Sequence, residues 1–348
     1  MKIFWRVFKK AKLTLLFLLT FAISIIHSGK AIAVDQSIIE AAKNEGQVYL
    51  YVGMNVEKLV PLVQKFKQKY PFINVQFYRG KSTEIMGRLS QEKRAKRHTA
   101  DVINATYYVW NDLKKGEFLM KYKSSETVTY PKVMKDPDDY WTVLFLQVNG
   151  MVYNTKLISP KEAPQNYEDL LDPRWKGKKV GLDAMEYSWF TIMLEILGEE
   201  KGLNFMRRLA KQELYLRNNK TLLTLLLAAG EFPILTTAHL DGAMLIKKTG
   251  APIDWVPASN PIPVTTSMVG VSANAPHPNS AKLFVDFLLS EEGQKMLSQM
   301  GNSVPRPGIE TALSHKIKGF DLRPINPALP TGFSDKLFNE IFKPSLMR

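Results

Sequence analysis

Between residues 47 and 105, segments with strand character alternate with segments with helix character. Residues 47–52, 73–78 and 101–105 are rich in β-branched and aromatic side chains. Between them, apolar residues recur at every third or fourth position through 56–70 and again around 85–89. The order strand, helix, strand, helix, strand predicts right-handed crossovers and a mainly parallel sheet. The predicted fold class is therefore α/β.

The loops that follow these three strands are predicted to share one edge of the sheet. In such folds the ligand crevice lies beyond the carboxyl ends of the strands, which here means loops 53–55, 79–83 and 106–108. Helix N-termini bearing hydroxyl groups bind anions, and Arg79 and Lys81 add positive charge. A small phosphate, phosphonate or carboxylate ligand is predicted, with solvent-facing Arg79 and Lys81 as the alternative. The predicted ligand-binding residues are Asn55, Arg79, Ser82, Thr83, Thr106, Tyr107, Tyr108, Tyr187, Ser188, Thr236 and Asp241.

The first 33 residues have the pattern of a secretory signal peptide. Five basic residues precede the apolar run from Leu13 to Ile26, and Ala31-Ile32-Ala33 forms a small-residue cleavage site. The apolar run is short for a membrane span, so an uncleaved anchor is the disfavoured alternative. Cleavage before Val34 removes six basic and no acidic residues, so the net charge falls by six from +14 to +8. A basic surplus of this size fits an anionic ligand or an anionic cell surface.

The chain contains no cysteine. Disulfides, a thiol nucleophile, cysteine-ligated zinc and a lipoprotein anchor are therefore excluded. With the signal peptide, this predicts a location in the periplasm. The basic tract 93–98 is predicted to form the exposed end of a helix, and nucleic-acid binding is not expected.

Two extended segments are predicted to connect two lobes. The segment 141–153 is strand-like but interrupted at Asn149-Gly150, and 261–273 should cross back. The expected lobes are residues 34–142 with 270–348, and residues 143–269. A hinged cleft between them would close around a ligand. Residues 222–229 are apolar nearly all round and predict a buried helix.

Residues 275–307 combine two helix patterns with several short sequence motifs in a characteristic order. An Ala-Pro-His-Pro-Asn loop, in which Asn279 or Ser280 is the expected cap, precedes Ala-Lys-x-Phe-Val-Asp-Phe-Leu. A Ser-Glu-Glu-Gly-Gln turn, a stop at Gly301 and a Pro-Arg-Pro sequence follow. This order resembles the C-terminal helices of bacterial extracellular solute-binding proteins, in the branch that includes the ferric-iron-binding proteins. Collinear similarities at 65–75, 100–102, 153–157, 163–177 and 229–233 extend the resemblance over most of the chain.

The resemblance implies a type 2 periplasmic-binding-protein fold. Each lobe would hold a mixed, mainly parallel sheet flanked by helices, and two crossing strands would join the lobes. The implied function is a monomeric receptor without a cofactor that passes a small molecule to an ABC permease in the inner membrane. A receptor that reports its ligand to a membrane sensor is an alternative.

The identity of the ligand does not carry over from the resemblance. Ferric-binding relatives place two adjacent tyrosines just after the strand that corresponds to 232–236, whereas this chain has Ala238-His239-Leu240-Asp241 there. His239 and Asp241 are possible metal ligands, although a solvated loop or helix cap is favoured. The adjacent pair Tyr107-Tyr108 lies in the other lobe, where stacking on or hydrogen bonding to an organic ligand and simple packing are equally expected. Iron binding without a tyrosine pair thus stays open as an alternative.

No pattern of catalytic residues is present. Histidine occurs five times, and HExxH, GxSxG and phosphate-loop sequences are absent. His239 and Asp241 lack the positioned nucleophile that a triad requires. A binding protein is predicted, with a periplasmic enzyme on the same fold as the alternative.

Overall fold

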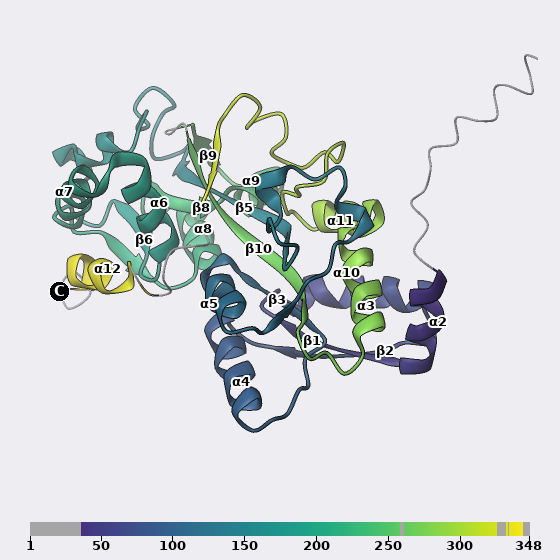
Figure 1. Cartoon of the computed structure of the whole chain (residues 1–348). Coiled ribbons are helices and arrows are strands. Elements are labelled where there is room, and N and C mark those ends of the chain that lie inside the picture. The colour runs from purple at the N-terminus through teal and green to yellow at the C-terminus, as the bar shows by residue number, and fades with distance from the viewer. Residues whose placement is uncertain (1–35, 258–260, 326–331, 333, 344–348) are drawn as a thin grey trace, which may run out of the picture. The chain divides into compact units, whose positions relative to one another are not determined.

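The computed structural model describes residues 36–257, 261–325, 332 and 334–343 (Figure 1). The predicted signal peptide, residues 1–33, lies outside this part. Residues Ser37–Arg348 cluster into one unit, separate from Met1–Gln36. Within the described ranges, no helix has both the length and the apolar character needed to cross a membrane.

The first part of the sheet has the predicted topology. Strands β1 (Gln47–Val52), β2 (Asn74–Arg79) and β3 (Val102–Thr106) lie in the order β2-β1-β3 and are parallel. Helices α3 (Val56–Lys69) and α4 (Ser82–Arg94) form the crossovers. These five elements match the sequence prediction to within a few residues, so the α/β assignment is confirmed.

Two long strands carry the chain out of this part and back again. Strand β10 (Ile262–Ser272) lies between β3 and β5 (Thr142–Asn154) and is antiparallel to both (Figure 1). The predicted interruption of β5 at Asn149-Gly150 is wrong, because β5 is continuous and only its register with the next strand shifts there. A Cβ atom on Gly150 would lie 2.8 Å from a methyl group of Leu240, which accounts for a glycine in this strand.

The second part of the sheet continues from β5. Strand β8 (Ile234–His239) pairs with β5, and β6 (Val180–Asp183) and β7 (Tyr215–Arg217) follow in parallel, while β9 (Ile253–Val256) pairs with the far end of β5. The mixed sheet, its flanking helices and the two crossing strands agree with the predicted fold. The helices of this region are α6 (Tyr187–Leu197), α7 (Glu199–Ala210), α8 (Lys220–Ala229) and α9 (Leu240–Lys248). The remaining α-helices and strands of the described residues are α2 (Gln36–Glu45), α5 (Trp110–Lys115), β4 (Leu119–Met120), α10 (Pro278–Leu289), α11 (Glu291–Gln299), β11 (Leu322–Pro324) and α12 (Asp335–Phe342).

The C-terminal helix α12 packs against α6 and α7 (Figure 1). Its residues Phe338 and Phe342 are fully buried, and the ring of Phe338 lies 5.7 Å from that of Phe190. These rings belong to one hydrophobic cluster with the side chains of β6 and α7. The predicted lobe boundaries at residues 142 and 269 remain a prediction, and α12 contributes to the core around α6.

Two local predictions are wrong. Helix α8 is not buried all round, because Leu222 and Leu225 are 45% and 51% exposed. Neither Asn279 nor Ser280 caps α10 with its own side chain. Instead the carboxylate of Glu45, at the end of α2, accepts hydrogen bonds from the backbone N–H groups of both residues, at 3.1 and 2.7 Å. A distant carboxylate thus satisfies the helix amides, which is favoured by the helix dipole.

Candidate ligand-binding site

The loops at the carboxyl ends of β1, β2 and β3 lie together, as the topology predicts. The N–H of Gly53 donates to the carbonyl of Asn104 at 2.8 Å. The hydroxyl groups of Ser82 and Thr106 are 3.0 Å apart, and the Thr106 N–H donates to the Ser82 hydroxyl at 3.1 Å. Three of the predicted loops therefore form one polar edge.

The predicted cationic residues of this edge are exposed. The Arg79 guanidinium donates to the Asn55 side-chain oxygen at 3.4 Å. Lys81 and Thr83 are exposed at the start of α4. Within the described ranges, neither Arg79 nor Lys81 forms an ion pair.

The predicted tyrosines connect this edge to α6 and α12. The Tyr107 hydroxyl donates to the Ser188 hydroxyl at 2.9 Å, and Tyr108 donates to the Asp335 carboxylate. Tyr187 reaches α12, where its ring lies 5.1 Å from that of Phe338. Burial raises the pKa of both Tyr107 and Tyr108, and Asp335 adds to the effect at Tyr108. Both phenols are therefore neutral in the ligand-free protein.

A second polar group lies at the end of β8, which extends three residues past the predicted strand. Thr236 and Thr237 are fully buried, and neither hydroxyl has a hydrogen-bond partner among the described residues. The same holds for the buried Nδ1 atom of His239, the last residue of the strand. His239 is also the N-cap position of α9, but its side chain makes no capping bond. The end of β8 and the start of α9 therefore bring together buried polar atoms that have no hydrogen-bond partner among the described residues.

Lys220 enters this region from α8. Its ammonium group contacts the Glu186 carboxylate at 2.5 Å and donates to the Asn149 side-chain oxygen at 2.7 Å. Asn149 is the direct cross-strand partner of His239 between β5 and β8. Burial raises the pKa of Glu186, although its contact with Lys220 acts in the opposite direction. Lys220 is therefore a nearly buried cation next to the unpartnered imidazole.

Lys58 reaches the same region from the first turn of α3. Its ammonium group donates to the Asn302 side-chain oxygen at 2.8 Å, and the neighbouring Ser303 hydroxyl donates to the Asp241 carboxylate at 3.0 Å. Burial lowers the pKa of Lys58, with Asp241 opposing the shift. Burial likewise raises the pKa of Asp241 to about 6. Burial, helped by the charges of Lys220 and Lys58, holds the pKa of His239 well below its usual value.

The sequence indicated part of this arrangement. Thr236 and Asp241 were predicted, and they lie in the second polar group, while Ser82, Thr106, Tyr107 and Ser188 lie in the first. Lys58, Lys220, Glu186, Asn149 and Asn302 were missed. Lys58 and Lys220 share one available signal, since each lies in the first turn of a helix that follows a strand.

The described residues do not include a group of three or more histidine and carboxylate side chains arranged to hold a metal ion. His239 and Asp241 are two residues apart, but the cations Lys58 and Lys220 act on the same place. Positive charge there opposes a bound cation and favours an anion.

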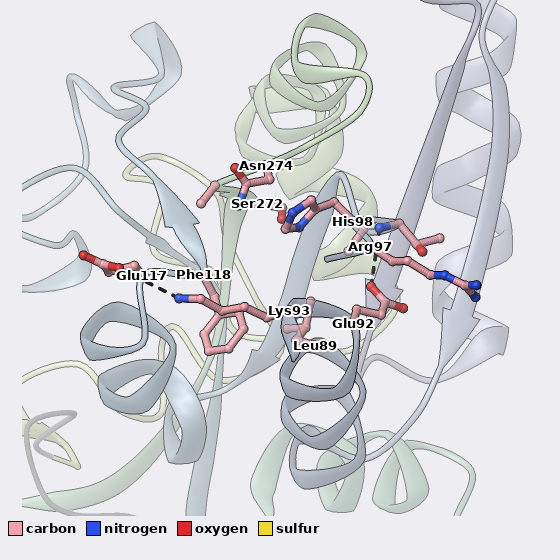
Figure 2. A pocket seen from close by; sticks show the side chains of 12 residues that line it. Leu89, Glu92, Lys93, Arg97, His98, Glu117, Phe118, Ser272 and Asn274 are labelled. Atoms are coloured by element: carbon pink, nitrogen blue, oxygen red, sulfur yellow. Dashed lines mark hydrogen bonds and ion pairs between the residues drawn. The ribbon is translucent and has the colours of Figure 1, made fainter. Parts of the chain in front are cut away.

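A small hollow lies elsewhere, between the end of α4, the residues Glu117 and Phe118 that precede β4, and the end of β10 (Figure 2). Leu89, Phe118 and Ser272 line it, and the Lys93 ammonium lies 5.0 Å from the centre of the Phe118 ring and 3.8 Å from the Glu117 carboxylate. Its volume of about 20 Å³ holds about one water molecule. It adjoins the start of β3, at the opposite end of that strand from Thr106, and therefore does not belong to the ligand crevice.

Comparison with known proteins identifies the family. Residues 98–318, more than half of the chain, match the family described as bacterial extracellular solute-binding protein. The chain belongs to this family. It is therefore a solute-binding protein of the ABC-transport type and not an enzyme, which confirms the family resemblance seen in the sequence.

The relatives differ in what their names say they bind. Iron uptake protein A1 of Synechocystis is 24% identical over 292 residues, which cover 78% of this chain and 79% of the relative. The putative 2-aminoethylphosphonate-binding periplasmic protein of Salmonella typhimurium is 23% identical over 246 residues, covering 67% and 69%. The structure of the periplasmic binding protein AfuA from Actinobacillus pleuropneumoniae, with exogenous fructose-6-phosphate bound, superposes with a TM-score of 0.73 at 21% identity, covering 87% and 99%. At these identities the likeness establishes the fold.

Proposed function

We propose that this protein binds a small anion of the phosphate, phosphonate or carboxylate type where the carboxyl ends of the strands meet, and delivers it to an ABC permease. The proposed location is the periplasm, after cleavage of the signal peptide. The AfuA structure and the Salmonella relative, whose names mention a sugar phosphate and a phosphonate, support this ligand class.

The observation that carries the proposal is Lys58. Its ammonium group is largely buried, its hydrogen-bond partner is the neutral amide of Asn302, and it forms no ion pair within the described ranges. A buried cation without a paired anion is costly, and a bound anion would offset that cost. Arg79 and Arg217, which end β2 and β7, likewise have no ion-pair partner among the described residues and add positive charge at the strand ends.

An anionic iron complex is the second candidate. The phenols of Tyr107 and Tyr108 and the carboxylate of Asp335 supply oxygen atoms that such a complex requires, and the Synechocystis relative is named for iron uptake.

Thermal unfolding of the mature protein tests both candidates. Inorganic phosphate, 2-aminoethylphosphonate, fructose 6-phosphate and ferric citrate should be added one at a time. A ligand that binds only the folded state adds about 2.7 kcal/mol to the free energy of unfolding at a hundredfold excess over Kd. Iron-free citrate is added in parallel, since citrate is itself a carboxylate. A shift with a phosphorus-containing anion or with iron-free citrate supports the first candidate, and a shift with ferric citrate but not with iron-free citrate supports the second. A response to none of them contradicts both.

Lys58→Met then tests the site. It should weaken binding of the anion found above at least tenfold without lowering thermal stability, because it removes a buried, unpaired cation. The matched control is Lys67→Met, an exposed lysine of the same helix, which should bind like the wild type. Equal affinity of Lys58→Met and Lys67→Met would refute the proposed position of the anion.

A further inference from the structure

The imidazole of His239 has an unusual position in the proposed site. It ends β8 at the start of α9, and its buried Nδ1 lacks a hydrogen-bond partner among the residues described. Two cations approach it from different helices. Lys220 is held by Asn149, the cross-strand partner of His239, and Lys58 is held by Asn302, next to the Ser303 that bonds Asp241.

This arrangement keeps the ligand-free imidazole neutral. Protonation would place a third positive charge beside Lys58 and Lys220. The acidic groups that face the region are already engaged, Glu186 by Lys220 and Asp241 by the Ser303 hydroxyl. The buried Nδ1 atom of this neutral imidazole makes no hydrogen bond within the described ranges and can therefore form one with a ligand.

From these contacts we infer that His239 contacts the anionic group of the ligand and takes up one proton from solvent when the ligand binds. This inference rests on the proposed function. An anion placed between Lys58 and Lys220 cancels the repulsion that opposes protonation, and the new Nδ1–H donates a charge-assisted hydrogen bond to an anion oxygen.

The inference fixes the direction of the pH dependence. The bound state holds the proton more tightly than the free state, so affinity rises as pH falls through the bound-state pKa of His239. The increase levels off below the free-state pKa. Each unit by which binding raises the pKa contributes up to tenfold in affinity.

Asp241 offers an alternative origin for such a dependence, because its pKa of about 6 lies in the same range and an approaching anion would raise it further. The ligand itself is another, because phosphate also titrates near neutral pH. Two controls separate these origins. Sulfate has no ionisable proton in this range, and Asp241→Asn removes the competing carboxylate.

Nuclear magnetic resonance of the histidine rings is the direct test. The chain after residue 33 contains His98, His239, His277 and His315, so few imidazole signals are expected. The full mature protein, labelled with ¹⁵N in histidine, is titrated from pH 5 to 9 with no anion, with inorganic phosphate and with sulfate. His239→Gln assigns its signal, and His315→Gln, at an exposed position, is the matched control.

The expected result is a His239 signal that, without an anion, stays neutral well below the pH at which a histidine ordinarily titrates, and that titrates at a higher pH with a bound anion. Binding to wild type and to Asp241→Asn should both strengthen towards pH 6, and His239→Gln should lose this pH dependence. If an anion binds but the His239 titration does not move, the inference is wrong and the proposed function stands. If no anion of the panel binds the wild type, both are wrong. The titration is measured on the wild type, so the inference can still be refuted if His239→Gln misfolds.

Discussion

The buried pair Lys220–Glu186 allows a quantitative test of the structure. Glu186 is 2% exposed and the Lys220 side chain 11%. Lys220→Met keeps the length and the apolar stem of the side chain but removes the charge. The Glu186 carboxylate would then be buried without a cation, and the Asn149 oxygen would lose a donor.

The expected loss of unfolding free energy follows from these contacts. Removing one partner of a buried ion pair costs about 3–5 kcal/mol. The lower end applies here, because Glu186 precedes α6 and still accepts the Trp189 N–H at 3.3 Å, where the helix dipole stabilises negative charge. Lys220→Met should therefore cost about 3 kcal/mol at pH 8. Because the pKa of Glu186 is raised, its carboxylate in the variant should take up a proton and lose its charge as pH falls. The stability cost of Lys220→Met should therefore shrink towards pH 5.

Urea unfolding of four proteins measures this effect: wild type, Lys220→Met, Glu186→Gln and the double variant. The double variant should recover most of the loss, because no unpaired charge remains. The control is Lys295→Met in the exposed pair Lys295–Glu291, which should change stability by less than about 0.5 kcal/mol. A loss below 1 kcal/mol in Lys220→Met, or an additive double variant, would show that the pair is solvated and that the reasoning fails.

Three further predictions concern stability, each measured by thermal or urea unfolding. Glu45→Ala should cost about 1–2 kcal/mol because the N-terminus of α10 loses its carboxylate, while exposed Glu40→Ala should be nearly neutral; equal effects would contradict the capping role. Gly293→Ala should destabilise by about 1–3 kcal/mol, since its Cβ would lie 2.2 Å from the Phe287 carbonyl oxygen, whereas Gly87→Ala, with open space in α4, should gain up to about 1 kcal/mol. Burial raises the pKa of Asp241 in the folded state from 3.8 to about 6, so its contribution to the free energy of unfolding is complete below pH 4 and is lost as pH rises through 6. The unfolding free energy of Asp241→Asn should therefore rise by roughly 2–3 kcal/mol relative to that of the wild type between pH 4 and 7. A difference between the two proteins that does not change with pH would refute the shift.

The sequence predicted those parts of the fold that depend on local pattern. The segment from β1 to α4 was predicted to within a few residues because each strand and helix shows its own periodicity and its own breaker. The cap of α10 was missed because Glu45 lies more than 230 positions earlier in the chain. Local rules favoured Asn279, but a carboxylate that satisfies several amides at once replaced it.

The candidate site likewise contains some residues that the sequence predicted and others that it did not. Topology placed the loops after β1, β2 and β3 at one edge, and the Ser82–Thr106 contact confirms that placement. The end of β8 was predicted too early. His239, which was expected in a loop or helix cap, occupies the N-cap position of α9 and is also the last paired residue of the strand, but its side chain makes no capping bond. Apart from their place in the first turn of a helix that follows a strand, Lys58 and Lys220 give no sign in the sequence that they converge, because their proximity to His239 depends on strand pairing between distant segments.

The position of β10 also determines the order in which the chain can assemble. This strand lies between β3 and β5, and the Asn104 amide that bonds the Ser267 hydroxyl is 163 positions away from it. During synthesis, β1, β2 and β3 are made before β10, so the edge of β3 that pairs with β10 has no partner until residue 272 is available. Such non-local pairing makes folding slow, because a long loop must close before the contacts form. The chain should therefore remain incompletely folded until most of it has been made, which is the state that the proposed export of this protein would require.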